Sequence, residues 1–484
     1  MKLHFRSLYG ILGWLWLFNG GFMLLCLPVS IYYDENEWQP LLISAIITIV
    51  AGIAAVFFTR KRGQEQLGKR DGYLIVSMGW LSMSLFGSLP YMLSGEIPTF
   101  TDAFFETMSG FTTTGASILT DIESISHGIL FWRSLTQWIG GMGIIVLTVA
   151  ILPILGIGGM QLFLAESPGI TPDKIKPRIN DTAKRLWLIY VILTVAEIVL
   201  LKLGGMPYFD AINHGLTTMA TGGFSTKNAS IAYYDSAFIQ YVIIAFMFLA
   251  GTNFTLNYFA LHGNLRKVLA NEEFRVYAII ALVFSLIIAL VIYLNSEGPA
   301  ELAFRNALFQ TVSVLTTTGY VTVDYTAWVP FAGMLLFMIM FIGASAGSTA
   351  GGVKVVRHII LFKNSALELR RQVHPSAVLP VRLNQKAVSP EITFNVMAFM
   401  IVYLMIFVIG AVVMGLMGHD FVTSAGASAT CLGNIGPGFG SVGPVDNFAH
   451  ISGFGKWFLA FLMMLGRLEL FTILILFSPY FWKR

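Results

Sequence analysis

Long apolar segments alternate with short polar segments along the whole chain. The segments of membrane-spanning length lie near residues 8–30, 41–59, 73–95, 128–153, 186–204, 237–261, 275–294, 331–361, 392–417 and 452–480. A transmembrane helix needs about 20 predominantly apolar residues, which matches the length of these segments. The first segment exceeds the apolar core of a signal peptide, roughly 7–15 residues, so we expect it to be retained. The pattern predicts an all-α polytopic membrane protein.

Composition excludes a soluble protein. Hydrophobic residues make up 56% of the chain and charged residues only 12%, whereas soluble domains are roughly 25% charged. So few charges cannot solvate the surface of a soluble chain of 484 residues. The two cysteines, Cys26 and Cys431, lie in apolar or glycine-rich surroundings. Neither a disulfide framework nor a cysteine metal site is therefore predicted.

Basic residues gather in alternate loops. The clusters are Arg60, Lys61, Arg62, Lys69 and Arg70; Lys174, Lys176, Arg178, Lys184 and Arg185; and Lys354, Arg357, Lys363, Arg370, Arg371, Arg382 and Lys386. The intervening loops carry Asp34, Glu35, Glu37, Glu96, Asp121 and Glu123 instead. Because cytoplasmic loops of membrane proteins are enriched in Lys and Arg, this asymmetry predicts cytoplasmic N- and C-termini. Nucleic-acid binding is the less favoured explanation, since membrane helices flank the clusters.

Four segments align without a gap over fourteen residues. They are DAFFETMSGFTTTG (102–115), DAINHGLTTMATGG (210–223), NALFQTVSVLTTTG (306–319) and TSAGASATCLGNIG (423–436). The eighth position always carries a hydroxyl group, and the fourteenth is always glycine. The first position predicts a helix N-cap, because Asp, Asn and Thr side chains accept a backbone N–H bond there. The residues at that position are Asp102, Asp210, Asn306 and Thr423.

Each of these segments lies between two apolar spans. A helix of about ten residues is roughly 15 Å long, half the hydrocarbon thickness of about 30 Å. It can enter the membrane but cannot cross it, and the backbone after it must line a cavity or be buried in protein. The sequence predicts four repeats of helix, pore helix and helix around one pore, after two extra N-terminal helices. The predicted units are residues 1–60, followed by repeats at 72–160, 184–263, 274–364 and 391–484.

The glycine-ended stretches suit a dehydrated cation. Rings of backbone carbonyls can replace lost water, and glycine permits the positive φ that such a backbone needs. Asp102, Glu106 and Asp210 are expected toward the outer mouth, where carboxylates concentrate cations. For Asp102 and Asp210, a role in helix N-capping alone is as plausible as attraction of cations.

The motifs FTTTGAS, TGGFST, TTTGY and GNIGPG resemble the filter segments of the Trk/Ktr/HKT superfamily of potassium transporters. The two extra N-terminal helices and residues 151–169 are similar to the TrkH subunits of bacterial Trk systems in particular. The resemblance covers essentially the whole chain. It implies a K⁺ selectivity filter made by Thr113, Thr114, Gly115, Thr221, Gly222, Gly223, Thr317, Thr318, Gly319, Asn434, Ile435 and Gly436.

Two features are candidates for a gate. The first is a run of small residues inside the second helix of the third repeat, where several glycines weaken helix formation. Its residues are Gly343, Ala344, Ser345, Ala346, Gly347, Ser348, Thr349, Ala350, Gly351 and Gly352. Close helix packing through small residues is the alternative.

The second gate candidate is Arg467, which lies in the middle of an apolar span. A charged side chain at this depth costs free energy, and residues of this kind usually have a functional role. The resemblance implies that its side chain protrudes into the pathway below the filter. A structural ion pair with Glu469 or Glu197 is the alternative.

These observations predict K⁺ uptake across the bacterial inner membrane through a gated, channel-like pore. A K⁺/H⁺ or K⁺/Na⁺ symporter is the alternative within transport, although secondary transporters usually contain two inverted repeats. A membrane enzyme is a distant alternative, because the eight histidines show no HExxH or comparable spacing.

Partners are implied by the resemblance alone. It implies a homodimer that binds a cytoplasmic, nucleotide-binding ring similar to TrkA. The basic segments near 174–185 and 354–386 are candidate docking sites for that ring. No cofactor other than the transported K⁺ is expected.

Overall fold

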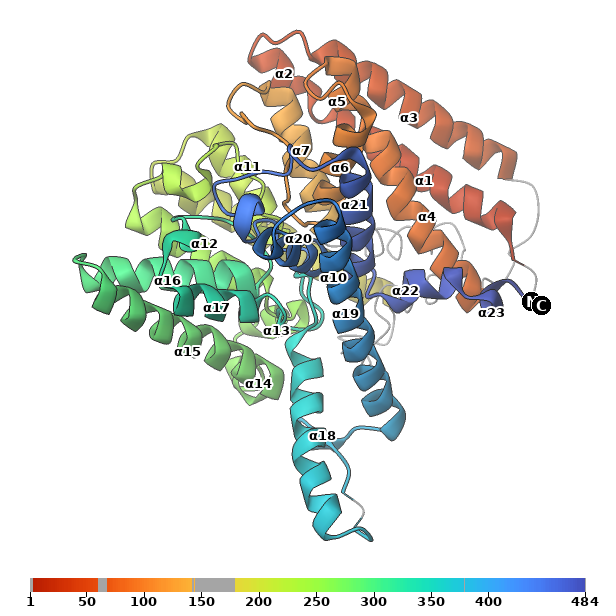
Figure 1. Ribbon diagram of the computed structural model, residues 1–484. Helices are drawn as coiled ribbons and strands as arrows, with labels where there is room; N and C mark the ends of the chain where they lie inside the picture. The colour runs from red at the N-terminus through yellow and green to blue at the C-terminus, as the bar shows by residue number, and fades with distance from the viewer. Residues whose placement is uncertain (1–2, 60–67, 142, 144–178, 378, 484) are drawn as a thin grey trace.

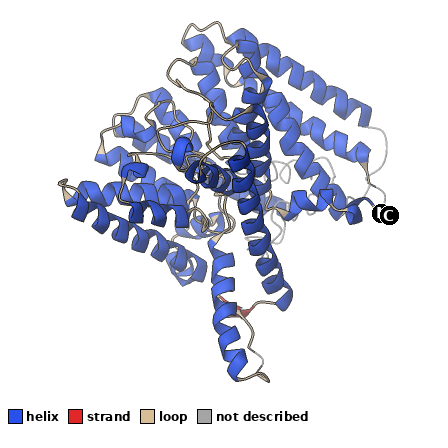
Figure 2. Cartoon of the chain, in the orientation of Figure 1, coloured by secondary structure: helices blue, strands red, loops and turns tan. Residues whose placement is uncertain are grey.

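The computed structural model describes residues 3–59, 68–141, 143, 179–377 and 379–483. Nearly all regular structure is helical (Figure 2), and the one small sheet pairs β1 (Arg382–Leu383) with β2 (Lys386–Ala387) in antiparallel register. Several predicted features lie outside the described residues: the family segment 151–169, the end of the first predicted repeat, and the basic residues Arg60, Lys61, Arg62, Lys174, Lys176 and Arg178.

An N-terminal hairpin precedes the repeats. It consists of α1 (Phe5–Leu24), α2 (Leu27–Tyr32) and α3 (Trp38–Thr59). α1 and α3 approach closely because small residues face each other: a Cβ built on Gly52 would lie 2.8 Å from the backbone oxygen of Gly13. Such small-residue contacts are typical of membrane helix pairs. α1 also lies beside α4 of the first repeat (Figure 1).

Four consecutive repeats form the rest of the chain. Their outer helices are α4 (Lys69–Gly87) with α5 (Leu89–Ser94), α10 (Ile179–Leu203), α15 (Glu272–Asn295) and α19 (Pro390–Leu416). Their pore helices are α6 (Phe100–Phe111), α11 (Tyr208–Met219), α16 (Ala300–Leu315) and α20 (Phe421–Gly433). Their second helices are α7 (His127–Gly141); α12 (Ala237–Ala250) with α13 (Phe254–Leu261); α17 (Pro330–Ile339) with α18 (Val355–Val373); and α21 (Gly453–Arg467) with α22 (Phe471–Leu474).

Short helices connect and end these units. They are η1 (Ser230–Tyr233), α14 (Leu265–Ala270), η2 (Tyr325–Ala327), η3 (Gly440–Val442), η4 (Ile475–Phe477) and α23 (Pro479–Trp482).

The second helices of the last three repeats are broken. α12 and α13 meet at 113°, and α21 meets the helical segment 471–477 at 111°. Asn253 helps to form the first break, since its side chain accepts the Thr255 N–H at 2.8 Å and so caps a new helix. In the third repeat, residues 340–354 separate α17 from α18. The predicted spans 237–261 and 452–480 therefore each consist of two helical segments that meet at a sharp bend.

The helices are long and apolar enough to cross a membrane. Among the described residues there are six such helices, or up to eight if each bent pair forms one span. Their outward faces remain apolar, as with Leu282 and Leu286 of α15, which are 52% and 50% exposed. The lipid of a bilayer would cover these exposed apolar faces. The described helices therefore confirm the prediction of an integral membrane protein.

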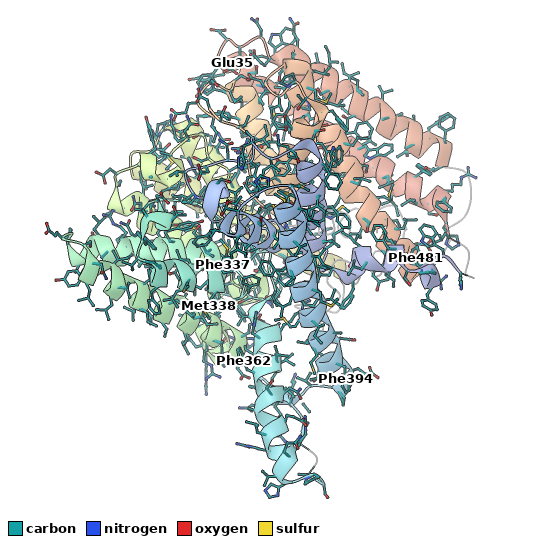
Figure 3. The ribbon with its side chains drawn as sticks, viewed as in Figure 1. Glu35, Phe337, Met338, Phe362, Phe394 and Phe481 are labelled. Carbon is teal, nitrogen blue, oxygen red and sulfur yellow. The ribbon has the colours of Figure 1, made fainter. Side chains whose placement is uncertain are left out.

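Different segments of the chain lie at the two opposite ends of the helix bundle. α18 and the adjoining end of α19 project beyond the bundle, whereas Glu35 lies at the opposite end (Figures 1 and 3). Both chain ends are held at the start of α4. The His4 N–H donates to Asp71 Oδ1 at 2.9 Å, and Arg70 donates to the Lys483 oxygen at 2.9 Å.

Candidate functional site

The pore helices begin earlier than the sequence predicted. α6 is capped by Thr99, whose hydroxyl oxygen accepts the Asp102 N–H at 3.3 Å. α20 is capped by Asp420, which accepts backbone N–H groups at 3.1 and 3.2 Å. Hydrogen bonds from Thr423 and Val422 lower the pKa of this carboxyl from its ordinary value.

The predicted N-caps are therefore wrong in all four repeats. A cap needs a non-helical backbone, but the predicted residues lie inside their helices. Asp102, Asp210 and Thr423 each follow the true cap by three residues, and Asn306 lies still further inside α16.

Each pore helix ends in the same way. The N–H of the thirteenth repeat residue donates to the carbonyl five residues earlier, a bond of the Schellman motif. These bonds are Thr114 to Ser109, Gly222 to Thr217 and Thr318 to Ser313 at 2.9 Å, and Ile435 to Thr430 at 3.0 Å.

The Schellman motif places the twelfth residue in the left-handed region. The φ angles of Thr113, Thr221, Thr317 and Asn434 are +53°, +54°, +57° and +54°. Asparagine tolerates this conformation, but a β-branched threonine is strained in it. Such strain, about 1–3 kcal/mol per residue, persists only where the surroundings enforce it and is concentrated at functional sites. The fourth repeat thus shares the backbone of the others, as the gapless alignment predicted.

The four glycine-ended segments converge and close a ring. A Cβ built on Gly115 would lie 2.2 Å from the Gly222 oxygen, and one on Gly223 would lie 1.9 Å from the Thr318 oxygen. One on Gly319 would lie 1.9 Å from the Ile435 oxygen, and one on Gly436 would lie 2.8 Å from the Thr114 oxygen. The fourteenth residue of each repeat therefore faces the thirteenth carbonyl of the next, and the fourth repeat returns to the first.

Glycine is required at this position for two reasons. The φ angles of Gly115, Gly223, Gly319 and Gly436 are +80°, +76°, +79° and +102°, a region that other residues rarely adopt. Any side chain would also collide with the neighbouring carbonyl, at a distance that real Cβ atoms do not reach. The ring is thus built from main chain, with a carbonyl oxygen of each segment close to the glycine of its neighbour.

In three repeats, the hydroxyl at the eighth position forms a hydrogen bond to the backbone at or directly after the ring glycine. This extended segment after the ring glycine is called the outgoing strand below. Thr217 donates to the Phe224 oxygen at 2.9 Å, and Ser313 donates to the Tyr320 oxygen at 2.7 Å. Thr430 donates to the Gly436 oxygen at 2.8 Å. Each bond fixes the backbone directly after the ring against its own pore helix. This gives the repeated hydroxyl a physical role that the alignment alone did not supply.

The run of small residues lies directly under the ring. The Gly351 N–H donates to the Thr317 hydroxyl at 2.7 Å, and a Cβ on Gly351 would lie 2.6 Å from the Gly433 oxygen. This segment, residues 343–352, is called the intramembrane loop below. It contacts the third and fourth repeats at the point where their ring segments begin.

The same loop is also fastened to the second repeat. The Thr349 hydroxyl contacts the Met219 and Ala250 oxygens at 3.0 and 3.2 Å. The Ser345 N–H donates to the Gly251 oxygen at 3.0 Å, and the Asn253 side chain donates to the Ala346 oxygen at 2.7 Å. The loop therefore crosses from the second repeat to the fourth beneath the ring.

Arg467, the last residue of α21, completes this layer. It donates to the Thr349 oxygen at 2.8 Å and to the Gly141 oxygen at 3.1 Å, and it also bonds the Gly140 oxygen. Its guanidinium thus joins the loop to α7 of the first repeat. The alternative partner Glu469 forms its ion pair with Arg357 of α18, which weakens the expectation of an Arg467–Glu469 pair.

The outer-mouth carboxylates are less available than the sequence suggested. Glu106 is fully buried and paired with Arg133 at 2.7 Å, so its charge is not available to concentrate cations at the mouth. Asp210 is 6% exposed and accepts the Thr226 hydroxyl at 2.6 Å. Asp102 pairs with Lys456 at 2.5 Å.

Sequence reasoning missed Arg133 and Gln137 of α7. Gln137 donates to the Gly222 oxygen at 2.6 Å and accepts the Phe224 N–H at 3.0 Å, so it holds the second ring segment from behind. A charged residue and an amide in the apolar segment 128–153 were the available signal, because such groups are costly inside a membrane.

Among the described residues, no group of three or more His, Cys, Asp or Glu side chains is placed to hold a metal ion. The ring instead presents backbone oxygen atoms, such as the Gly222 and Thr318 oxygens that face the neighbouring glycines. Oxygen ligands of this kind suit hard cations.

Four pore-helix repeats whose strained main-chain segments meet in one ring define an integral membrane protein of the pore-loop class. The sequence model of TrkH, described as a cation transport protein, matches residues 38–484, and the chain belongs to this family.

Individual relatives agree over the full length. The Trk system potassium uptake protein TrkH of Salmonella typhimurium is 42% identical over 486 residues, covering 99% of this chain and 100% of the relative. The Trk system potassium uptake protein TrkG of Escherichia coli is 37% identical, with 99% of each chain covered. The crystal structure of the potassium transporter TrkH from Vibrio parahaemolyticus has a TM-score of 0.90 at 38% identity, covering 99% and 100% of the two chains.

Proposed function

We propose that this chain takes up K⁺ across the bacterial inner membrane through a gated, channel-like pore. The full-length relatives are named as potassium uptake proteins of Trk systems. At the identities observed, the same cargo is the simplest assignment.

The closed ring of main-chain segments carries the proposal. A monovalent cation that leaves water loses tens of kcal/mol of hydration in a low-dielectric site, and inward carbonyl oxygens can replace that hydration. The segments Thr113–Gly115, Thr221–Gly223, Thr317–Gly319 and Asn434–Gly436 form the proposed selectivity filter. The pore helices end at these segments, so the partial negative charge of each helix C-terminus also stabilises a cation there.

The intramembrane loop and Arg467 form the proposed gate. The loop lies below the filter, and Arg467 fastens it to the first repeat. A guanidinium on the ion pathway raises the energy of a cation by charge repulsion. Opening then requires that the loop and Arg467 leave these carbonyl contacts.

Orientation and partners follow from charge and shape. We assign α18 to the cytoplasmic side, because it bears Arg370 and Arg371 in its last turn and lies opposite Glu35 (Figure 3). Both chain ends are then cytoplasmic. The projecting α18 offers a docking site for a TrkA-like nucleotide-binding ring, beneath a homodimer of this chain.

One observation favours K⁺/H⁺ symport as a second candidate function. Glu197 of α10 is fully buried beside the Thr218 side chain, and no described basic side chain forms an ion pair with it. Carboxyl groups at membrane depth serve as proton relays in many transporters. Reversal potentials measured under an imposed proton gradient distinguish the two functions, because only a symporter shifts its reversal potential with the gradient.

Rubidium uptake tests the primary proposal. Purified chain is reconstituted into liposomes, and uptake of radioactive Rb⁺ is driven by a K⁺ gradient. We expect uptake that unlabelled K⁺ suppresses at lower concentration than Na⁺. Equal suppression by the two ions would contradict a K⁺-selective filter.

A further inference from the structure

The first repeat holds its outgoing strand differently from the other three. Ser109 occupies the eighth position, but its hydroxyl is buried without a hydrogen-bond partner among the described residues. The bond made by Thr217, Ser313 and Thr430 in their repeats therefore has no counterpart among the described residues of the first repeat. Another group must therefore fix the strand that follows Gly115.

Glu106 takes that role from the preceding turn of α6. Its Oε1 accepts the Ser117 hydroxyl at 2.9 Å, and its Oε2 accepts the Ile118 N–H at 2.9 Å. Both donors lie directly beyond Gly115 and Ala116. In the first repeat, the Glu106 carboxylate thus makes the hydrogen bonds between pore helix and outgoing strand that a hydroxyl makes in the other repeats.

This carboxylate is neutralised by Arg133 of α7, which also reaches the second repeat. Arg133 Nε donates to Glu106 Oε1 at 2.7 Å, and another of its nitrogens donates to the Ser225 oxygen at 3.0 Å. Its guanidinium lies 3.5 Å from the centre of the Phe224 ring. Phe224 and Ser225 directly follow Gly223 of the second filter segment.

The pair is the most deeply buried ion pair that the structure describes, with side chains 3% and 0% exposed. Two other filter interfaces use neutral contacts, and the Asp102–Lys456 ion pair between the first and fourth repeats lies in the first turn of α6, with the Asp102 side chain 25% exposed. Tyr320 donates to the His214 oxygen at 3.1 Å between the third and second repeats, and Tyr325 donates to the Gly438 oxygen at 2.9 Å between the third and fourth. Among the described residues, an ion pair that bonds the backbone directly after the filter glycines is therefore found only between the first and second repeats.

We propose that Glu106 and Arg133 are specificity-determining positioning residues that fix the distance between the first and second filter segments. The proposal rests on the assignment of these segments as a K⁺ filter. Ion sites work only when their ligands are held within about 0.5 Å of the required geometry. The planar guanidinium can bond a carboxylate and a carbonyl at once, which makes it a rigid spacer. A looser spacer lets the ring contract around the smaller Na⁺ ion.

Two variants test the bridge. Arg133→Lys keeps the positive charge beside Glu106 but offers only a compact head in place of the planar fork, so the Ser225 contact is weakened. The double variant Glu106→Gln with Arg133→Gln removes both charges together, which avoids an unpaired charge in the interior. If the double variant does not fold, Arg133→Lys alone decides the question.

Two matched controls accompany them. Ser109→Ala lies on the same pore helix, one turn from Glu106, and removes a hydroxyl without a described partner. Lys227→Gln removes an ion pair with Glu123 that also joins the first two repeats, but at the partly exposed outer surface. Neither touches the bridge.

The measurement is the Na⁺/K⁺ permeability ratio of proteoliposomes under bi-ionic conditions, for variants that elute as monodisperse protein. We expect the ratio to rise at least threefold in both bridge variants and to stay at the wild-type value in both controls. A folded bridge variant with the wild-type ratio would overturn the inference while K⁺ uptake itself stands. A wild-type protein that shows no preference for K⁺ would instead refute the proposed function, and the inference with it.

Discussion

Arg467 and Thr349 are 118 residues apart in the chain, yet the guanidinium of one donates to the backbone oxygen of the other at 2.8 Å. This bond joins the end of α21 to the intramembrane loop. Because Arg467 also bonds Gly140 and Gly141 of α7, three repeats meet at one side chain. A single side chain therefore fastens the intramembrane loop to the first and fourth repeats, which is the basis of the proposed gate.

Replacement of Arg467 by alanine should increase cation flux. A hydrogen bond from a charged donor contributes about 1.5–3 kcal/mol, so the loss of the Thr349 bond alone should raise flux by roughly ten- to a hundredfold. Rubidium uptake is measured at equal reconstituted protein. Arg305→Ala is the control, because Arg305 pairs with Glu301 one turn earlier on its own helix. Unchanged flux in a folded Arg467 variant would remove this residue from the gate.

Thr349→Val should open the same gate more weakly. Valine preserves the shape of the side chain but cannot donate to the Met219 and Ala250 oxygens. The lost bond is worth about 1 kcal/mol, so uptake should rise about fivefold. Thr326→Val, at η2 and outside the loop, should leave uptake unchanged. A lower melting temperature without faster uptake would show that Thr349 is a structural residue only.

Removal of the eighth-position hydroxyl should affect stability and uptake in the third repeat but not in the first. Ser313→Ala removes the 2.7 Å bond to the Tyr320 oxygen and should lower the free energy of unfolding by about 1 kcal/mol, with weaker Rb⁺ uptake. Ser109→Ala should be neutral in both measurements, because its hydroxyl has no described partner. Equal effects of the two substitutions on thermal unfolding and uptake would contradict the role assigned to these bonds.

The sequence predicted the architecture better than the details of each element. Gly115, Gly223, Gly319 and Gly436 could be found because a repeated backbone conformation demands the same residue four times. The helix starts were missed, because capping depends on the backbone angles of Thr99 and Asp420, which the alignment of residues 102–115 and 423–436 does not include.

Polar contacts between residues far apart in the chain could not be predicted from the sequence. The Glu106–Arg133 pair and the Arg357–Glu469 pair join residues 27 and 112 positions apart. A charge in an apolar segment indicates that a partner exists, but only the packing of helices selects it. The break after Ala250 depends on the same packing, because its freed backbone groups bond to the third repeat: the Gly251 oxygen accepts the Ser345 N–H, and the Phe254 N–H donates to the Gly347 oxygen.

The central claim is that main-chain oxygens from four segments surround one cation, and Gly319→Ser tests it most directly. A Cβ at Gly319 would lie 1.9 Å from the Ile435 oxygen, so the ring must deform. Gly418→Ser is the matched control: its φ is +92°, so the backbone strain is comparable, but no atom lies within 4 Å of the added Cβ.

The measurement is the ratio of Rb⁺ to Na⁺ uptake in proteoliposomes that contain wild-type or variant protein. We predict that Gly319→Ser lowers this ratio about tenfold, the effect of roughly 1.4 kcal/mol of lost selectivity, while Gly418→Ser keeps the wild-type ratio. A folded Gly319→Ser protein that selects Rb⁺ over Na⁺ as well as the wild type would contradict the account.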